Sequence, residues 1–303
     1  MWSYIAQQII NALSYGSILG LLAVGYTMIY GILGLINFAH GEIFMIGAFA
    51  CYLLSAHWDL PWVVGATGAV IASATVGIML QRFVYKPCLK RKASVLTMFI
   101  ASFAASLGLR FFFLMLYTDD RKPFPIPELF DTMYFVGDVA IGFRDIAIFI
   151  STILVMLFLT YFIRYTKIGI AMRAVSFDVR TAEHMGVNSE KIIIAAFIIG
   201  SLLAGLSAIE YGLSFGVVNP SMGFLPGLSG FIAAVIGGIG NVPGAMLGGF
   251  IIGVGEVLFV AALPTEYSPI RPLFVWALLL VILFLKPSGL FRANVKFEGT
   301  WET

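Results

Sequence analysis

Residues 31–47 read Gly-Ile-Leu-Gly-Leu-Ile-Asn-Phe-Ala-His-Gly-Glu-Ile-Phe-Met-Ile-Gly, an apolar stretch interrupted by glycines and polar groups. The glycines weaken a helix, and Asn37, His40 and Glu42 place polar groups where a membrane helix would face lipid. In hydrocarbon, unpaired backbone groups cost several kcal/mol unless they line a cavity or meet protein partners. We therefore predict a helix that breaks beside a solute pathway, with Asn37 capping the half that follows. The alternative is an ordinary cap at the membrane edge, with His40 and Glu42 among the headgroups.

The composition around this stretch is that of a membrane protein. Of 303 residues, 60% are hydrophobic and 11% are charged, whereas soluble domains are about a quarter charged. The net charge of +2 gives no reason to expect nucleic acid as a partner. Two cysteines, Cys51 and Cys88, support neither a disulfide framework nor a four-ligand metal site. The start of the chain lacks the basic residues of a signal peptide, so we expect its first apolar stretch to be an uncleaved span.

Apolar runs of spanning length occur throughout the chain. A transmembrane helix needs about 20 mostly apolar residues. The candidate spans are 9–30, 36–56, 62–81, 95–117, 144–163, 191–211, 227–240, 245–263 and 271–285. Residues 227–240 would extend only about 21 Å as an α-helix, which is too short to cross unaided. We predict an all-α polytopic bundle of eight or nine transmembrane helices with broken or re-entrant segments, forming one transmembrane domain over residues 1–303.

The charges of the loops predict the orientation. Residues 82–94 hold five basic residues and no acid, and residues 164–191 are again rich in Lys and Arg. Residues 118–143 hold five acids against two basic residues. Because basic loops stay in the cytoplasm, we expect 82–94, 164–191 and the C-terminus inside and 118–143 outside. Nine crossings place the N-terminus outside; eight place it inside or make one segment re-entrant.

A second glycine-rich stretch runs from Gly227 to Gly255 and contains Gly-Gly-Ile-Gly-Asn-Val-Pro-Gly at 237–244. Small residues at every fourth position let helix backbones approach closely. Asn241 and Pro243 interrupt two half-length apolar runs. Two interrupted segments, one in each half of the chain, are typical of a transporter with an internal repeat. We predict that Gly237, Gly238 and Gly240 lie on the pathway, the alternative being close packing alone.

A third stretch, Arg164–Lys191, predicts a short cytoplasmic helix. Ser176 can cap a helix over 177–185, Asp178 falls in its first turn, and Gly186 supplies a stop. An amphipathic helix there suits docking into a partner's groove, or resting on lipid headgroups. Its apolar residues are Phe177, Ala182 and Met185.

Together these three stretches resemble the high-affinity branched-chain amino acid ABC permeases of the Liv type. The matching segments are Gly34-Leu35-Ile36-Asn37-Phe38-Ala39-His40-Gly41-Glu42, the glycine run at 237–249, and Gly169-x-x-Met172-Arg173-Ala174-Val175-Ser176-x-Asp178-x-x-x-Ala182-x-x-Met185-Gly186-Val187-Asn188. The resemblance covers nearly the whole chain and favours the LivH-like subunit over its longer LivM-like partner. Phe177 departs from the family pattern, in which a polar residue is common at this position.

The resemblance implies a permease subunit in the bacterial inner membrane. It implies a second, LivM-like permease, two cytoplasmic ATP-binding subunits and an external substrate-binding protein. No Walker A motif occurs here, so ATP would be hydrolysed by partners, and no cofactor is expected on this chain. Urea-type permeases share these signatures, so the identity of the solute stays open. The choice between a homodimer and a heterodimer also stays open. The implied ATPase coupling loop contains Gly169, Arg173, Ser176, Asp178, Ala182 and Gly186.

Arg110 and Glu256 are ionisable residues inside predicted spans, where charge is expensive and indicates function by default. The sequence leaves open whether they pair with one another, and a packing salt bridge is the simpler interpretation.

Two other classes of function can be weighed. The segment Gly227-Leu228-Ser229-Gly230 matches the G-x-S-G of intramembrane serine proteases of the rhomboid type. That chemistry needs a histidine base after the serine, and all three histidines precede it, so we expect no catalytic residues. An ion-coupled secondary transporter would use intramembrane acids such as Glu42, Glu210 and Glu256. The coupling-loop motif favours the importer, because a self-sufficient transporter has no ATPase to dock.

Overall fold

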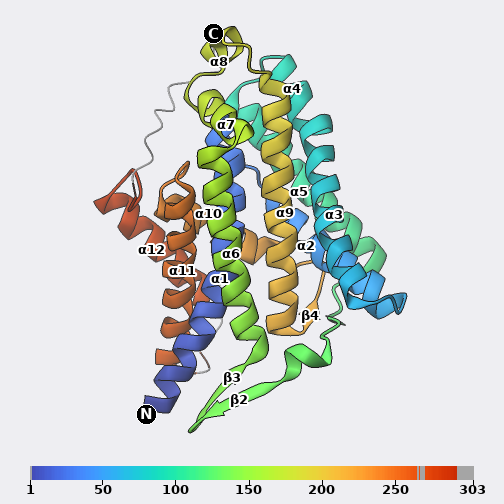
Figure 1. Ribbon diagram of the computed structural model, residues 1–303, viewed down its shortest axis with the longest axis vertical. Helices are drawn as coiled ribbons and strands as arrows, with labels where there is room; N and C mark the ends of the chain where they lie inside the picture. Colours follow the sequence, from blue (N-terminus) through green and yellow to red (C-terminus); the bar gives the residue numbers. More distant parts are fainter. Residues whose placement is uncertain (1, 265, 267–269, 292–303) are drawn as a thin grey trace.

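The computed structural model describes residues 2–264, 266 and 270–291, and helices dominate this part of the chain (Figure 1). The long helices are α1 (Trp2–Leu33), α3 (Trp62–Leu80), α5 (Val95–Tyr117), α6 (Phe143–Tyr165), α9 (Ser189–Phe215) and α11 (Val242–Ala262). Shorter helices are α2 (His40–Tyr52), α4 (Lys86–Lys90), α7 (Lys167–Phe177), α8 (Val179–His184), α10 (Phe224–Gly237) and α12 (Arg271–Leu285). Within the described residues, six helical segments are long and apolar enough to cross a membrane. The predicted all-α membrane fold is confirmed, while the count of eight or nine crossings stays a prediction.

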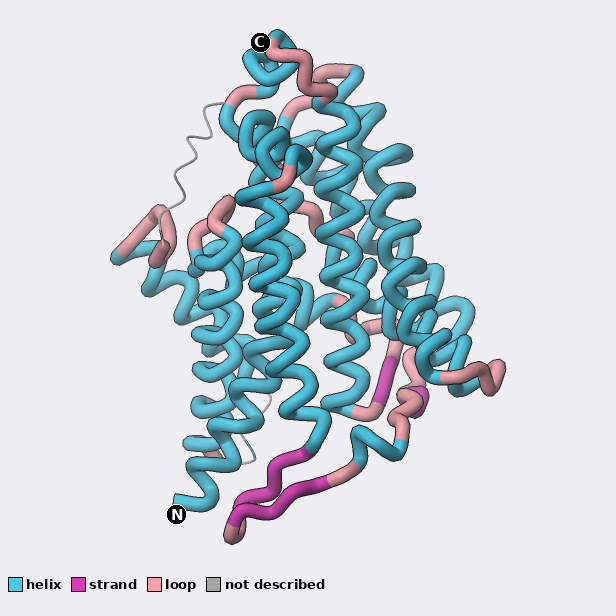
Figure 2. Tube along the Cα trace, in the orientation of Figure 1, coloured by secondary structure: helices cyan, strands magenta, loops and turns pink. Residues whose placement is uncertain are grey.

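Short irregular elements complete the chain. Two π-helical turns, Leu53–His57 and Gln81–Tyr85, continue α2 and α3, and a 3-10 turn covers Glu128–Asp131. Strands β2 (Met133–Val136) and β3 (Val139–Gly142) form an antiparallel hairpin, with Met133 opposite Gly142. Strands β1 (Lys122–Pro123) and β4 (Val217–Val218) form a second antiparallel pair (Figure 2).

The core is built from two similar pairs of helices. Helix α1 packs on α11, and α9 packs on α3. At the first contact Gly16 and Gly20 lie against Gly253 and Gly249, and at the second Gly205 lies against Ser73. Small residues allow these backbones to approach closely without the hydrophobic driving force that water supplies.

The order of elements also repeats. A long helix, an extended segment, a half-length helix and another long helix occur as α1–α2–α3 and again as α9–α10–α11. In each set the half-length helix packs on the long helix that follows it. The two sets run in opposite directions through the bundle, because α1 starts at the end of the molecule where α9 finishes (Figure 1). This is the arrangement of an inverted repeat.

The first break lies where the sequence predicts it, but Asn37 does not cap the following helix. Helix α1 ends at Leu33, and Gly34 takes a positive φ of 66° that a side chain would disfavour. Asn37 Oδ1 accepts a hydrogen bond from Ala39 N at 3.1 Å, inside the connecting turn. Helix α2 begins only at His40, with Ala39 as an N-cap that makes no side-chain bond. Asn37 therefore stands too early to reach the free N–H groups of α2.

The second break differs from the prediction. Residues 238–241 form the turn between α10 and α11, which pack side by side, and Gly240 lies against Gly31 in the last turn of α1. Asn241 Oδ1 accepts from Gly244 N at 3.1 Å and caps α11. The break that corresponds to residues 34–39 is instead the segment 216–223 before α10. It contains Gly216 with φ of 68° and strand β4.

The two ends of the bundle carry different loops. Helices α4, α7 and α8 lie at one end, whereas the β2–β3 hairpin and the start of α1 lie at the other (Figure 1). An ion pair between Lys86 and Glu190 joins the basic loop 82–94 to the start of α9. The two basic loops therefore share one end, and the acidic loop 118–143 occupies the other. Their sides of the membrane stay predictions.

Candidate substrate route

Helices α2 and α10 begin at the same place inside the bundle. Gly41 and Gly223 meet backbone to backbone, and a β-carbon on Gly41 would lie 3.2 Å from the Cα of Gly227. The first N–H groups of a helix have no partner within the helix. Two half-helices that meet at their amino ends therefore bring polar backbone and positive dipole ends together in an apolar environment.

A cavity of about 190 Å³ lies beside this meeting point. It is smaller than the roughly 300–1,000 Å³ pockets that hold drug-sized ligands, so it suits a small solute. Glu42 and Ser106 are the non-aromatic polar side chains in its wall. Most of the remaining wall is aromatic and comes from Tyr26, Phe38, Phe103, Phe224, Phe231 and Trp276.

Glu42 and Arg110 flank the cavity. Ser106 Oγ donates to Glu42 Oε1 at 3.3 Å, while the other carboxylate oxygen is buried without a partner in the described residues. Arg110 Nη2 donates to Ser221 Oγ at 3.2 Å, and its guanidinium lies 5.5 Å from the centre of the Phe224 ring. Arg110 therefore anchors the extended segment before α10.

Glu256 does not pair with Arg110. It forms a salt bridge with Arg271, and Ser229 Oγ donates to its other oxygen at 3.1 Å. The packing salt bridge favoured from the sequence is thus present, with a different basic residue. Ser229 serves as a hydrogen-bond donor in this contact.

His40 and Asn37 are buried next to the cavity. The His40 ring lies 4.5 Å from the Tyr26 ring, and neither ring nitrogen has a hydrogen-bond partner among the described residues. Asn37 lines a small neighbouring space with Tyr26 and Ile239, and its Nδ2 is likewise unpartnered there. Buried polar groups of this kind indicate either bound water or contact with a solute.

The glycine run lies further along α10. A β-carbon on Gly237 would meet the backbone of Gly244, and one on Gly238 would meet that of Phe291. Gly238 and Gly240 both have positive φ, of 97° and 88°. Gly237 and Gly238 thus allow the close turn between α10 and α11, and the structure does not bring them into the cavity wall.

The loop 164–191, predicted to couple to the ATPases, contains two helices, α7 and α8, where the sequence predicts one. Ser176 lies inside α7 and donates to Arg173 O at 2.8 Å, so it caps nothing. Asp178 is the N-cap of α8, and the N–H of Thr181 that bonds its carboxylate lowers the pKa of Asp178. Gly186 ends this segment with φ of 85°, as expected.

The faces of the loop are now defined. Gly169 packs on Phe162 and Ile163, and Ala182 is buried within the protein. Phe177 and Met185 are exposed, by 66% and 82%. The exposed apolar side chains that flank α8 are therefore Phe177, the last residue of α7, and Met185, which follows α8, whereas Ala182 is not among them.

Residues 8–285 match the sequence model of a family described as "Branched-chain amino acid transport system / permease component". The chain belongs to this permease family.

Individual relatives agree with this membership. The chain is 37% identical over 95% of both chains to the high-affinity branched-chain amino acid transport system permease protein LivH of Salmonella typhimurium. It is 36% identical over 94% of both chains to the corresponding protein BraD of Pseudomonas aeruginosa. The autoinducer 2 import system permease protein LsrC of Escherichia coli is more distant, at 26% identity over 84% of this chain and 72% of that protein. PsaBC from Streptococcus pneumoniae, solved with a Fab, has the same fold, with a TM-score of 0.51 at 14% identity over 92% and 91% of the two chains.

Several contacts of this branched-chain permease family member were missed from its sequence. Arg271 is the first residue of the predicted span 271–285 and is not among the predicted site residues. A lone arginine at the start of a span is nevertheless a signal that could have suggested it as the partner of Glu256. Trp276 and Ser106 looked like ordinary span residues. Their places in the cavity wall depend on how α12 and α5 pack, which has no local signal.

Proposed function

We propose that this chain is one of two membrane subunits of an ATP-driven importer for branched-chain amino acids. The observation that carries the proposal is the cavity where α2 and α10 begin, with its aromatic wall and few polar groups. A branched-chain amino acid has an apolar side chain and a zwitterionic backbone, so its route needs mostly apolar walls with occasional polar contacts.

The route runs past Glu42 and Ser106 and then past His40 and Asn37. The unpartnered polar atoms of Glu42, His40 and Asn37 can bond to a passing ammonium or carboxylate without holding it tightly. Gly41 keeps the two helix ends together, and the glycines at 237, 238 and 240 hold α10 against α11 beyond the cavity. An external binding protein supplies the affinity.

The partners follow from the ATP-binding-cassette family. A LivM-like permease completes the membrane part, and two cytoplasmic ATPases dock on the exposed face of α8. The family is that of the bacterial inner membrane, with lipid against the exposed apolar faces of α5 and α6. The basic loops and the C-terminus face the cytoplasm, because they carry the excess of Lys and Arg.

The test is uptake by proteoliposomes that contain the permease pair, the ATPases and the binding protein. We expect ATP-dependent uptake of leucine, isoleucine and valine and none of urea. Ser106→Phe fills the cavity and should lower the maximal rate at least about tenfold. Asn37→Ala should lower the rate several-fold and leave the apparent affinity, set by the binding protein, almost unchanged.

Other outcomes assign a different function. Uptake of urea in place of the amino acids would reassign the solute. Uptake driven by an ion gradient without the ATPases would make the chain a secondary transporter. A large loss of apparent affinity in Asn37→Ala, at unchanged maximal rate, would show a dedicated binding site at the break.

A further inference from the structure

A second and larger cavity lies at the end of the bundle that carries the β2–β3 hairpin. Its volume is about 520 Å³, and it is lined by the first turns of α1, the hairpin, the starts of α6 and α12 and the ends of α9 and α11. Of the site residues predicted from the sequence, only Glu256 lines this cavity.

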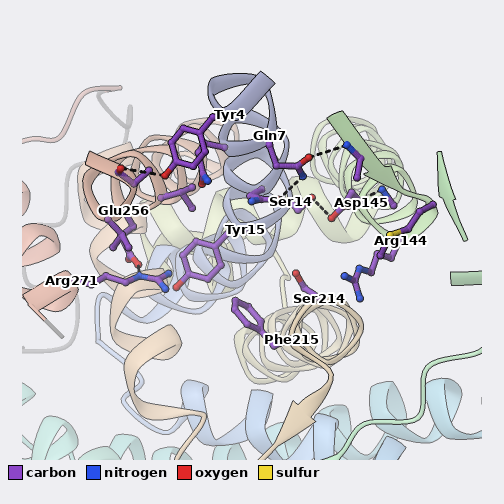
Figure 3. Close-up of a pocket in the computed structure, with 18 of the residues that line it drawn as sticks. Tyr4, Gln7, Ser14, Tyr15, Arg144, Asp145, Ser214, Phe215, Glu256 and Arg271 are labelled. Atoms are coloured by element: carbon purple, nitrogen blue, oxygen red, sulfur yellow. Dashed lines mark hydrogen bonds and ion pairs between the residues drawn. The ribbon is translucent and has the colours of Figure 1, made fainter. Parts of the chain in front are cut away.

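The cavity contains two cations and two anions, Arg144, Arg271, Asp145 and Glu256. Arg271 is engaged, since it pairs with Glu256 and its guanidinium lies 4.4 Å from the centre of the Tyr15 ring. Arg144 makes no hydrogen bond or ion pair within the described residues. In Figure 3 its guanidinium points toward Ser214, on the opposite side of the view from the Glu256–Arg271 pair. The cavity thus offers one uncommitted guanidinium.

An acceptor for a cation lies next to that guanidinium. Asp145 Oδ1 accepts from Ser14 Oγ at 2.9 Å, and Oδ2 accepts from Gly142 N at 3.2 Å. A carboxylate has about four lone-pair sites, so two remain for an ammonium group. Arg144 and Asp145 are consecutive residues in the first turn of α6.

The last turns of α11, beyond Glu256, form an apolar part of the cavity wall. It presents Val257, Val260 and Ala261, all of which line the space. Equal numbers of cations and anions favour a ligand of zero net charge with separated charges over a simple anion. Small aliphatic walls favour a branched hydrocarbon side chain.

We propose that this cavity is a receiving site for the free zwitterion of an aliphatic α-amino acid, with its carboxylate on Arg144, its ammonium on Asp145 and its side chain on α11. Ser229 and Glu256 connect this site to the central route, because Ser229 follows Leu228 of the central cavity wall and bonds to Glu256 of the outer one. The inference rests on the proposed function and adds a second station to the same route.

The test measures binding of tritiated L-leucine to the assembled permease–ATPase complex in nanodiscs without the binding protein. Arg144→Gln should weaken this binding about tenfold, the loss expected for a charged hydrogen bond, and Arg144→Lys should recover part of it. Leucinol, which lacks the carboxylate, should bind as weakly to the wild type as leucine binds to Arg144→Gln. Arg121→Gln is the matched control, since Arg121 is an exposed arginine of the loop 118–143 that precedes α6 and lies outside the cavity wall.

A second variant separates binding from folding. Ala261→Phe fills the apolar wall and should abolish leucine binding in complexes that still co-elute with the ATPases on size exclusion. Leucine binding that is unchanged in both Arg144→Gln and Ala261→Phe, or equal binding of leucinol, would overturn the receiving site. If the wild-type complex imports leucine with its binding protein while these variants bind normally, only this inference fails. Loss of amino acid import by the wild type itself would instead refute the proposed function.

Discussion

Single glycines determine how closely the two half-helices approach. Gly41, Gly223 and Gly227 meet through their backbones, and none of them has space for a β-carbon without a shift of its neighbours. Gly108, in the middle of α5, is the opposite case, because a β-carbon there would have nothing within 4 Å. Both kinds of glycine look the same in the sequence.

Gly41→Ala should destabilise the folded permease by about 1–3 kcal/mol, the usual cost of overpacking a close contact. The added methyl group collides with the carbonyl of Gly223, which belongs to a backbone that cannot rotate away. Thermal unfolding of the purified complex measures the change, together with uptake, which should fall.

Gly108→Ala is the control for this prediction. It should be neutral or stabilise by up to about 1 kcal/mol, because alanine is the better helix former. Equal stability of the two variants would show that α2 and α10 do not meet through Gly41.

At the scale of an element, α8 is a short helix fixed by one cap. Asp178 bonds to the N–H of Thr181, and Val187 N bonds back to Ala182 O at 3.0 Å after the turn. The sequence places a cap in this region but selects Ser176, because a serine or an aspartate can each cap a helix. Only the packing of Val175 and Met172 in α7 extends that helix through Ser176 and moves the cap to Asp178.

Asp178→Ala should reduce the stimulation of the ATPases by the permease several-fold, whereas Asp178→Asn, which keeps an oxygen acceptor, should retain most of it. The bound N–H lowers the pKa of Asp178 in the folded state. Its stabilising charge is therefore complete above the ordinary aspartate pKa of about 4 and is lost only as the pH falls through the lower folded value. ATPase stimulation between pH 6 and 8 should accordingly show no step from this group. Equal losses in both variants would exclude the cap as the cause.

Phe177 and Met185 should carry the docking of the ATPases. Replacing both by alanine removes the two exposed apolar side chains that flank α8 and should weaken co-purification of the ATPase subunits by about tenfold or more. Met115→Ala is the matched control, because Met115 is 76% exposed on α5 and far from the loop. Normal co-purification of the double variant would mean that the ATPases contact another surface.

For the whole molecule, the sequence was sufficient where a signal is local. The bounds of α5 and α12 are those predicted, since apolar length and flanking charge define a span. The arrangement of α2 against α10, the pairing of Glu256 with Arg271 and the walls of both cavities depend on contacts between distant segments. The glycine pattern at 237–249 predicted a place on the pathway, with close packing alone as the alternative, and did not reveal that its turn lies at the end of α10 and outside the wall of the central cavity.

The orientation of the whole chain can be tested by labelling. Cys88 lies in the basic loop and should react with an impermeant thiol reagent only from the cytoplasmic side. A cysteine that replaces Asp131, exposed at the opposite end, should react only from outside. Cys51 is buried and should stay unlabelled in the folded protein. The reverse pattern of Cys88 and position 131 would invert the bundle.

The meeting of α2 with α10 also constrains how the chain enters the membrane as it is synthesised. Helix α10 has 14 residues, or about 21 Å, against about 30 Å of hydrocarbon. Alone, α10 would leave polar backbone groups in lipid. In the folded protein its first turn packs against Gly41, which belongs to a segment that is synthesised long before α10. The translocon therefore cannot release α10 as a finished span. We expect α9, α10 and α11 to remain loosely placed until the N-terminal half has moved against them, so that the central break is among the last parts of the protein to form.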